Sequence, residues 1–171
     1  MSSLIRDVKL TDAKAILDIY AKYILETTIT FEIEVPSLES FTTRIKTISE
    51  KFPYIVYEED GKIIGYAYVT KFKERAAYNH SVECTVYIDS EHTGKGIGQK
   101  LYTELFSLTK QLGFRNVYAY ITLPNPNSLK IHEKFGFHEV GVYKNVGFKF
   151  NNLIDVICLE LLLIKDLHLP N

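Results

Sequence analysis

Apolar residues recur every three or four positions in four segments of the chain, which is the spacing of an amphipathic helix. In the first segment, Ile16, Ile19 and Tyr20 share one helical face. Thr11 precedes them as a candidate N-cap. The segments predicted to be helical are residues 12–25, about 38–51, the stretch from the glycines at 94–98 to about residue 112, and 126–134.

The segments between these helices are β-branched, aromatic and partly alternating, which predicts strands. Two such runs flank Asp60-Gly61 within residues 54–70 and predict a hairpin. The other predicted strands are residues 5–9, 82–88, 116–121, about 138–143 and 153–162. Residues 27–36 are expected to be a loop or a short extended segment, and residues 71–80 a polar loop. Helices interleaved with strands predict an α/β fold with a mixed sheet, and no linker divides residues 1–171, so we expect one domain.

Composition narrows the classes of function. The 171 residues are 46% hydrophobic and carry a net charge of −1, so we expect no nucleic acid and no anionic membrane as the main partner. The most apolar stretch, residues 153–164, is too short to span a bilayer. The first residues contain no apolar signal region, and we expect no secretory signal.

The two cysteines, Cys84 and Cys158, lie within strand-like runs. Both are predicted to be buried free thiols, which favours a reducing, cytoplasmic location. Neither a CxxC nor an HxxxH spacing occurs, so we expect no metal site.

Three glycines, Gly94, Gly96 and Gly98, occupy alternate positions between a predicted strand and a predicted helix. A strand, a glycine-rich turn and a helix N-terminus form an arrangement that holds phosphate, because unpaired N–H groups meet the anion without a Cβ in the way. The spacing is not that of a Walker A loop, and Gln99 stands where a dinucleotide fingerprint needs its third glycine. A plain flexible turn is the alternative.

The segment VYIDSEHTGKGIGQKLY, residues 86–102, resembles the acetyl-CoA pyrophosphate loop, [QR]xxGx[GA], of the GNAT acyltransferase superfamily. The resemblance implies the GNAT (acyl-CoA N-acyltransferase) fold, with about seven strands and four helices, and acetyl-CoA as the acetyl donor. Thr93 departs from the motif, since the family has Gln or Arg there. The residues that the resemblance assigns to acetyl-CoA in this segment are Val86, Tyr87, Ile88, Thr93, Gly94, Lys95, Gly96, Ile97, Gly98 and Gln99. A backbone N–H near Tyr87 or Ile88 is expected to bind the oxyanion.

A second family signature, NxxAxxxYxxxGF, is similar to residues 125–137. The match assigns Asn125 and Ser128 to the acetyl-CoA site, Asn125 through the pantetheine arm. It also places His132 where many relatives have a catalytic-acid tyrosine. An exposed helix histidine is the alternative for His132, and a turn or helix cap is the alternative for Asn125.

Four longer stretches resemble the phosphinothricin acetyltransferase branch of this superfamily. They are TTITFEIE at 27–34, FKERAAYNHSVECTVYID at 72–89, NPNSLKIHEKFGF at 125–137 and VGFKFNNLIDV at 146–156. Leu153 departs from the branch, which has tryptophan there. The resemblance implies a homodimer that acetylates a small amine resembling an amino acid, of the phosphinothricin or methionine sulfoximine type. The residues implied for the acceptor site are Phe31, Arg75, Tyr78 and Lys149.

Glu83 is the candidate general base. Strand alternation puts Glu83, Thr85 and Tyr87 on one face, and periodicity alone favours a solvent-facing carboxylate. The resemblance instead implies that Glu83 deprotonates the attacking amine directly or through water. Acetylation of a protein N-terminus or lysine, and a non-catalytic acyl-CoA-binding module, remain alternative functions.

Overall fold

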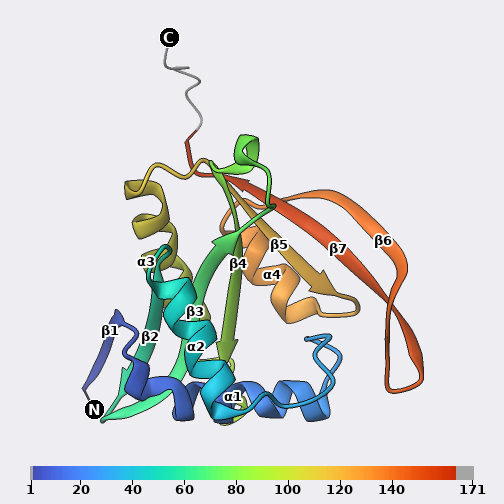
Figure 1. Ribbon diagram of the computed structural model, residues 1–171. Helices are drawn as coiled ribbons and strands as arrows, with labels where there is room; N and C mark the ends of the chain where they lie inside the picture. The colour runs from blue at the N-terminus through green and yellow to red at the C-terminus, as the bar shows by residue number, and fades with distance from the viewer. Residues whose placement is uncertain (1, 165–171) are drawn as a thin grey trace.

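The computed structural model describes residues 2–164, which form one seven-stranded sheet and four α-helices (Figure 1). The strands are β1 (Ser3–Asp7), β2 (Tyr54–Glu59), β3 (Lys62–Lys71), β4 (Ser81–Ile88), β5 (Asn116–Thr122), β6 (His138–Lys149) and β7 (Asn152–Leu162). The helices are α1 (Ala13–Glu26), α2 (Leu38–Ser49), α3 (Ile97–Gln111) and α4 (Pro126–Lys134). The order of helices and strands along the chain is the predicted one.

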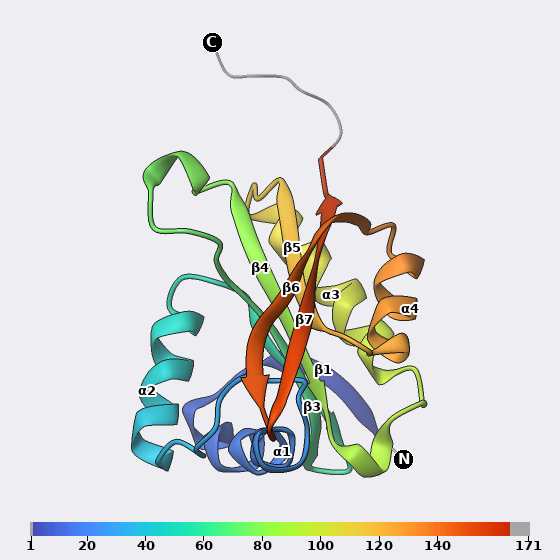
Figure 2. The same ribbon diagram turned by 90° about the vertical axis from the view of Figure 1, so that its right-hand side faces the viewer.

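The strands lie in the order β1-β2-β3-β4-β5-β7-β6, and β4 with β5 is the parallel pair among antiparallel ones. Helices α1 and α2 cover one face of the sheet, while α3 and α4 cover the other (Figure 2). Two apolar clusters fill the two layers: one includes Ile16 of α1, and the other includes Leu101 of α3. The predicted mixed α/β sheet is confirmed.

The beginning of α1 differs from the prediction. Residues Leu10–Asp12 form a 3-10 turn, and α1 begins at Ala13 with Asp12, rather than Thr11, as its N-cap. The Asp12 carboxylate accepts the Lys9 N–H at 2.7 Å and is paired with Arg6. This ion pair between Asp12 and a residue of β1 fixes the turn, and no local pattern predicts such a pairing.

Strand β6 is longer than predicted, because its register with β7 shifts at two irregular points, after Glu139 and after Tyr143. Such shifts break the alternation of apolar and polar residues, so the sequence pattern ends early. The smaller shifts at β1, which spans 3–7 instead of 5–9, and at α2, which ends at Ser49, concern terminal residues.

The parallel strands β4 and β5 separate within the sheet. They pair only from Ser81 with Asn116 to Glu83 with Tyr118, and beyond that point they diverge (Figure 1). Because β3 still pairs along β4 as far as Ile88, the edge of β4 that faces β5 keeps backbone groups without a strand partner. The gap between the two strands positions the site described next.

Candidate active site

A cavity of about 230 Å³ lies where β4 and β5 separate. It is lined by residues 83–87 of β4, residues 119–122 of β5, Tyr102 of α3, residues 29–31 after α1, and three polar residues at α4, which are Asn125, Ser128 and His132. Side chains from both faces of the sheet reach it, because the missing strand pairing opens a passage from one layer to the other. The predicted site residues from three separate motifs therefore meet here.

Glu83 lies on the face of the sheet that α1 and α2 cover. Its β4 neighbour Tyr87, on the same face, packs against Tyr20 and Tyr23 of α1. Within residues 2–164 the structure records no hydrogen-bond donor for the Glu83 carboxylate, and burial raises the pKa of this group. A half-buried carboxylate whose pKa moves upward towards neutrality suits proton abstraction. The solvent-facing alternative is wrong, since Glu83 lines the cavity.

On the opposite face, Cys84, Tyr102 and His132 form a hydrogen-bonded chain. The Cys84 thiol donates to Tyr102 Oη over 3.7 Å, and Tyr102 Oη lies 3.1 Å from His132 Nε2. His132 Nδ1 lies 2.7 Å from the Ser128 carbonyl oxygen. His132 is only 2% exposed, so the exposed-histidine alternative is wrong, and burial lowers the pKa of its imidazole.

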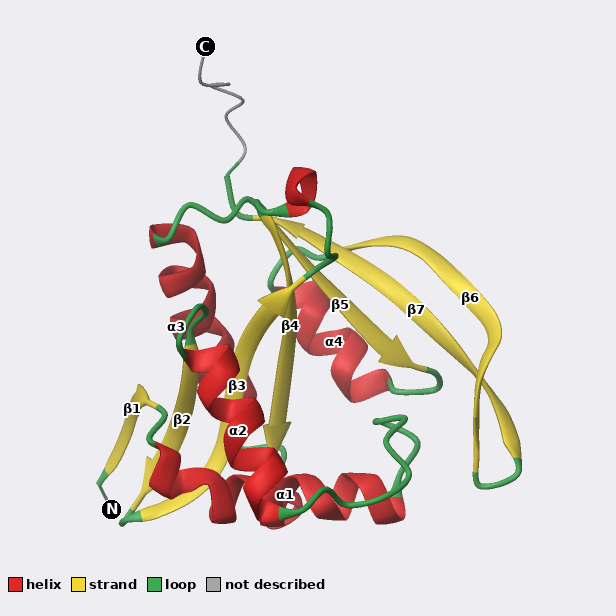
Figure 3. Cartoon of the chain, in the orientation of Figure 1, coloured by secondary structure: helices red, strands yellow, loops and turns green. Residues whose placement is uncertain are grey.

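The loop after α1 rises from the end of that helix (Figure 3), and its residues 29–31 line the cavity. Its Thr30 is held twice: Tyr20 Oη lies 2.7 Å from Thr30 Oγ1, and Lys149 Nζ donates to the Thr30 carbonyl at 2.8 Å. The Phe31 ring packs directly on Gly147 of β6, where a Cβ would overlap the ring. Phe31 therefore forms a wall of the cavity.

Three of the four predicted acceptor residues lie outside the cavity lining. Lys149 is 4% exposed, and its ammonium binds the Thr30 carbonyl, so it tethers the loop that carries Phe31. Arg75 precedes the short turn Ala76–Tyr78 in the exposed loop before β4. Tyr78 packs edge-on against Phe72, which stacks on Tyr118 of β5. Phe31 alone of the four touches the cavity.

The glycine loop enters α3 in the conformation that glycine favours. Gly94 and Gly96 have φ of 77° and 76°, and Gly96 is the N-cap of α3. A Cβ at Gly98 would press on the Ile131 side chain of α4, so Gly98 lets α3 and α4 approach closely. Residues 93–96 and Gln99 are exposed. The first N–H groups of α3 thus face solvent at a helix N-terminus, which is the requirement for an anion site.

Asn125 caps α4, because its side chain accepts the Ser128 N–H at 3.2 Å. The helix-cap interpretation is confirmed, and the same residue lines the cavity. Val86 and Tyr87 also line it, whereas the Ile88 carbonyl accepts the Tyr23 hydroxyl at 2.6 Å. Backbone groups alternate in direction along a strand, and the Asp89 N–H bonds the Ile64 carbonyl on the β3 side. The backbone groups of Val86 and Ile88 therefore point towards the gap, and those of Tyr87 point towards β3.

Sequence reasoning missed Tyr102, Cys84 and Tyr120 as cavity residues. Tyr102 falls on the apolar face of α3 with Leu101 and Leu105, so its spacing indicates only core. Tyr120 alternates outward on β5, as an exposed strand residue would. No local signal distinguishes these tyrosines from the others of the chain.

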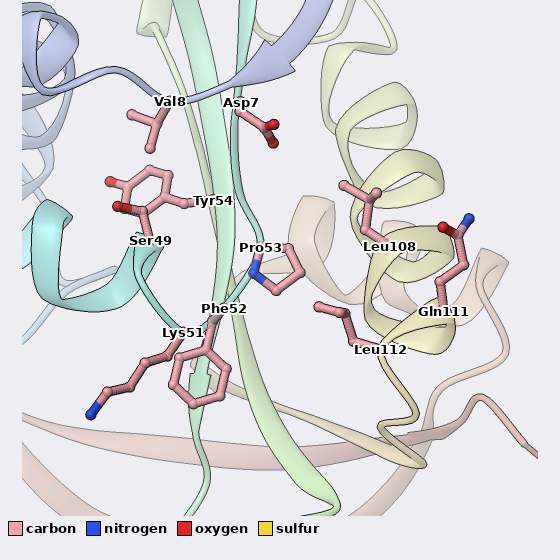
Figure 4. Close-up of a pocket in the computed structure, with 10 residues that line it drawn as sticks. All are labelled: Asp7, Val8, Ser49, Lys51, Phe52, Pro53, Tyr54, Leu108, Gln111 and Leu112. Atoms are coloured by element: carbon pink, nitrogen blue, oxygen red, sulfur yellow. The ribbon is translucent and has the colours of Figure 1, made fainter.

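A larger hollow of about 450 Å³ lies elsewhere, between the end of β1, the turn from α2 to β2 and the C-terminal part of α3 (Figure 4). Its polar side chains are Asp7, Ser49, Lys51 and Gln111, and none of the predicted site residues reaches it. The smaller cavity is therefore the candidate active site. Among residues 2–164 no group of His, Cys, Asp or Glu is placed to hold a metal ion, and no helix in that range has the length and apolar character needed to cross a membrane.

The chain is similar to known acetyltransferases. The family model described as an acetyltransferase (GNAT) domain matches residues 5–158. A phosphinothricin N-acetyltransferase of Streptomyces coelicolor is 37% identical over 153 residues, which cover 87% of this chain and 90% of that protein. The phosphinothricin N-acetyltransferase of Streptomyces viridochromogenes is 34% identical over 152 residues, covering 89% and 83%.

Among solved structures, a phosphinothricin acetyltransferase of Sinorhizobium meliloti in complex with acetyl-CoA superposes with a TM-score of 0.91. The two sequences are 35% identical, and the match covers 95% of this chain and 89% of that one.

Proposed function

This chain belongs to the acetyltransferase (GNAT) family and is an N-acetyltransferase that uses acetyl-CoA, and we propose that it acetylates the amine of a small acceptor resembling an amino acid. The observation that supports the proposal best is Glu83, a half-buried carboxylate to which no group of residues 2–164 donates a hydrogen bond, in a cavity that opens between β4 and β5.

Acetyl-CoA, the acetyl donor, would lie along α3 and α4. The pyrophosphate would bind the N–H groups at the start of α3, around Gly96 and Gly98, because glycine leaves the backbone open to phosphate oxygens there. Thr93, Lys95, Ile97 and Gln99 would flank it. Asn125 and Ser128 would meet the pantetheine arm beside the cavity that they line.

Acetyl transfer proceeds by direct attack of the amine. Glu83 removes the proton from the ammonium form of the acceptor, and the free amine attacks the thioester carbonyl. The charge that develops on the carbonyl oxygen is stabilised by a backbone N–H of the diverging edge of β4, near Tyr87. In the described part of the chain, β5 pairs with β4 only as far as Glu83, so it leaves these N–H groups without a strand partner.

The small cavity and the Phe31 wall favour a small acceptor over a protein. The volume of about 230 Å³ is below that of typical pockets for drug-sized ligands. We propose that the acceptor carries a carboxylate and that Arg75 binds it when the loop before β4 closes over the site, since a guanidinium binds both oxygens of a carboxylate. Tyr78 would flank Arg75, and Lys149 would act through the Phe31 loop.

An acceptor screen tests this function. With acetyl-CoA and detection of released thiol, free amino acids and phosphinothricin should be acetylated. The matching methyl esters should lose most of kcat/KM, because Arg75 would be left unpaired when the loop closes over the site. Arg75→Ala should abolish the preference for the free acid, while the exposed-loop variant Lys73→Ala should keep it. Equal rates with acids and esters, or a preference for peptides, would favour protein acetylation instead.

We further propose a homodimer that packs through the outer face of the β6–β7 hairpin. Phe148 and Leu153 face each other across the two strands, and each is 63% exposed. The hairpin projects from the body of the molecule (Figure 1), and an exposed apolar pair on an edge of a sheet is typical of an interaction surface. The free, buried thiols Cys84 and Cys158 suit the reducing cytoplasm as the location.

Light scattering at micromolar concentration should give the mass of a dimer. Replacing both Phe148 and Leu153 with aspartate should shift the mass to that of a monomer, because two charges would have to be buried in the interface. The same double change at two exposed positions elsewhere, Leu25 and Leu112, should leave the dimer intact. A monomer mass for the unchanged protein would refute the proposal.

A further inference from the structure

The hydrogen bonds around His132 have a defined direction. The Ser128 carbonyl can only accept, so the 2.7 Å contact requires a proton on His132 Nδ1. Burial lowers the pKa of the imidazole, and the neutral ring then has a bare Nε2. Tyr102 must therefore donate its hydroxyl proton to Nε2 across 3.1 Å. His132 has no free proton to give to a substrate.

Tyr102 places a hydroxyl group, hydrogen-bonded to His132, at the cavity. It lines the same cavity as Glu83, and it lies five residues into α3 from Ile97, about 8 Å along the helix axis from the N-terminus. His132 contacts the edge of the Tyr102 ring and fixes its hydroxyl. We propose that Tyr102 protonates the thiolate that leaves acetyl-CoA, with His132 as a positioning residue, an inference that rests on the proposed acetyl transfer.

The surroundings make a leaving thiolate strongly basic. Cys84 is a thiol in the same cavity, within hydrogen-bond distance of Tyr102, and burial raises its pKa to about 12. A CoA thiolate released at the same place is destabilised by the same desolvation and needs a proton. Burial also raises the pKa of Tyr102, so its hydroxyl stays protonated throughout the neutral range and is available as the donor.

Glu83 first passes the ammonium proton to solvent. Attack of the free amine then forms the C–N bond, and the Glu83 carboxylate accepts the proton that the nitrogen loses in becoming an amide. Collapse of the intermediate breaks the C–S bond and leaves the electron pair on sulfur. The Tyr102 hydroxyl turns from His132 Nε2 to the sulfur, its O–H bond breaks and an S–H bond forms. The proton that Glu83 took from the nitrogen then reprotonates the Tyr102 phenolate. The net reaction converts the amine and the thioester into an amide and a thiol.

Changing the basicity of the leaving group separates this role from a structural one. Tyr102→Phe should lower kcat with acetyl-CoA by about 10²-fold, the lower end for loss of an acid or base. With acetyl-seleno-CoA, in which selenium replaces the thioester sulfur, the difference between the two proteins should fall below about threefold, because a selenolate is a much weaker base and leaves without a proton. The matched control is Tyr54→Phe, at a buried tyrosine outside the cavity, which should behave as the unchanged protein with both donors.

Failure of this inference and failure of the proposed function give different results. An equal loss in Tyr102→Phe with both donors overturns the inference and leaves the proposed function standing. No transfer by the unchanged protein to any amine overturns both. Nitrogen-15 NMR of the imidazole should show the proton on Nδ1 whether or not transfer is observed. A proton on Nε2 instead would restore His132 as the donor and refute the role of Tyr102.

Discussion

Replacing Glu83 with glutamine is expected to lower kcat by 10²–10⁴-fold, the usual cost of removing a general base. The amide keeps the size and polarity of the carboxylate but cannot accept the proton of the acceptor ammonium. Acetyl-CoA should still bind with nearly unchanged affinity, because the groups proposed to hold its pyrophosphate and pantetheine arm lie at the N-terminal ends of α3 and α4, and the β4 groups near Glu83 would act through backbone atoms that the substitution leaves in place. Steady-state rates and a titration with acetyl-CoA measure the two effects separately.

The pH profile gives an independent readout for Glu83. Burial raises its pKa, so the unchanged enzyme should lose kcat/KM as the pH falls through that raised value, above the range of an exposed glutamate. Glu83→Gln should lack this acidic limb. Glu104→Gln, which alters an exposed carboxylate on α3, should retain both the rate and the limb. Full activity of Glu83→Gln across the limb would exclude Glu83 as the base.

Gly96→Asp is expected to weaken acetyl-CoA binding by more than 10²-fold while the fold persists. The position is exposed at the N-terminus of α3, where the pyrophosphate would bind. A carboxylate at this position would repel the negatively charged pyrophosphate. Bringing like charges together costs several kcal/mol, and each 1.4 kcal/mol lowers the affinity about tenfold. Calorimetric titration with acetyl-CoA measures the change.

A matched control separates the effect of backbone strain in Gly96→Asp from the effect of its charge on the pyrophosphate. Gly61, in the turn between β2 and β3, has φ of 79°, close to the 76° of Gly96, and a Cβ meets nothing within 4 Å at either position. Gly61→Asp therefore introduces the same strain and charge away from α3, and it should bind acetyl-CoA normally. Equal affinities for Gly96→Asp and the unchanged protein would remove the pyrophosphate from this loop.

Local patterns predicted most of the fold, since each helix and strand is marked by the period of its own apolar residues. They failed where a distant contact sets the boundary. Asp12 begins α1 because it pairs with Arg6 of β1, and β6 continues past its pattern because β7 holds it through two changes of register. The candidate site was predicted in part, because the glycine loop and Glu83 belong to recognisable motifs, whereas Tyr102 resembles any other tyrosine on an apolar helix face.

The sequence by itself determined the order of helices and strands, the glycine conformation before α3 and the burial of the two cysteines, because these depend on backbone preferences and on apolar spacing over a few residues. The tertiary structure decided what the polar residues do. Lys149 binds the carbonyl of Thr30, 119 positions away, and His132 receives the hydroxyl of Tyr102, 30 positions away. Whether a polar side chain faces water, a cavity or a partner depends on segments that meet only on folding. The separation of β4 from β5 is such a property, and it places Glu83 and Tyr102 on opposite sides of one cavity.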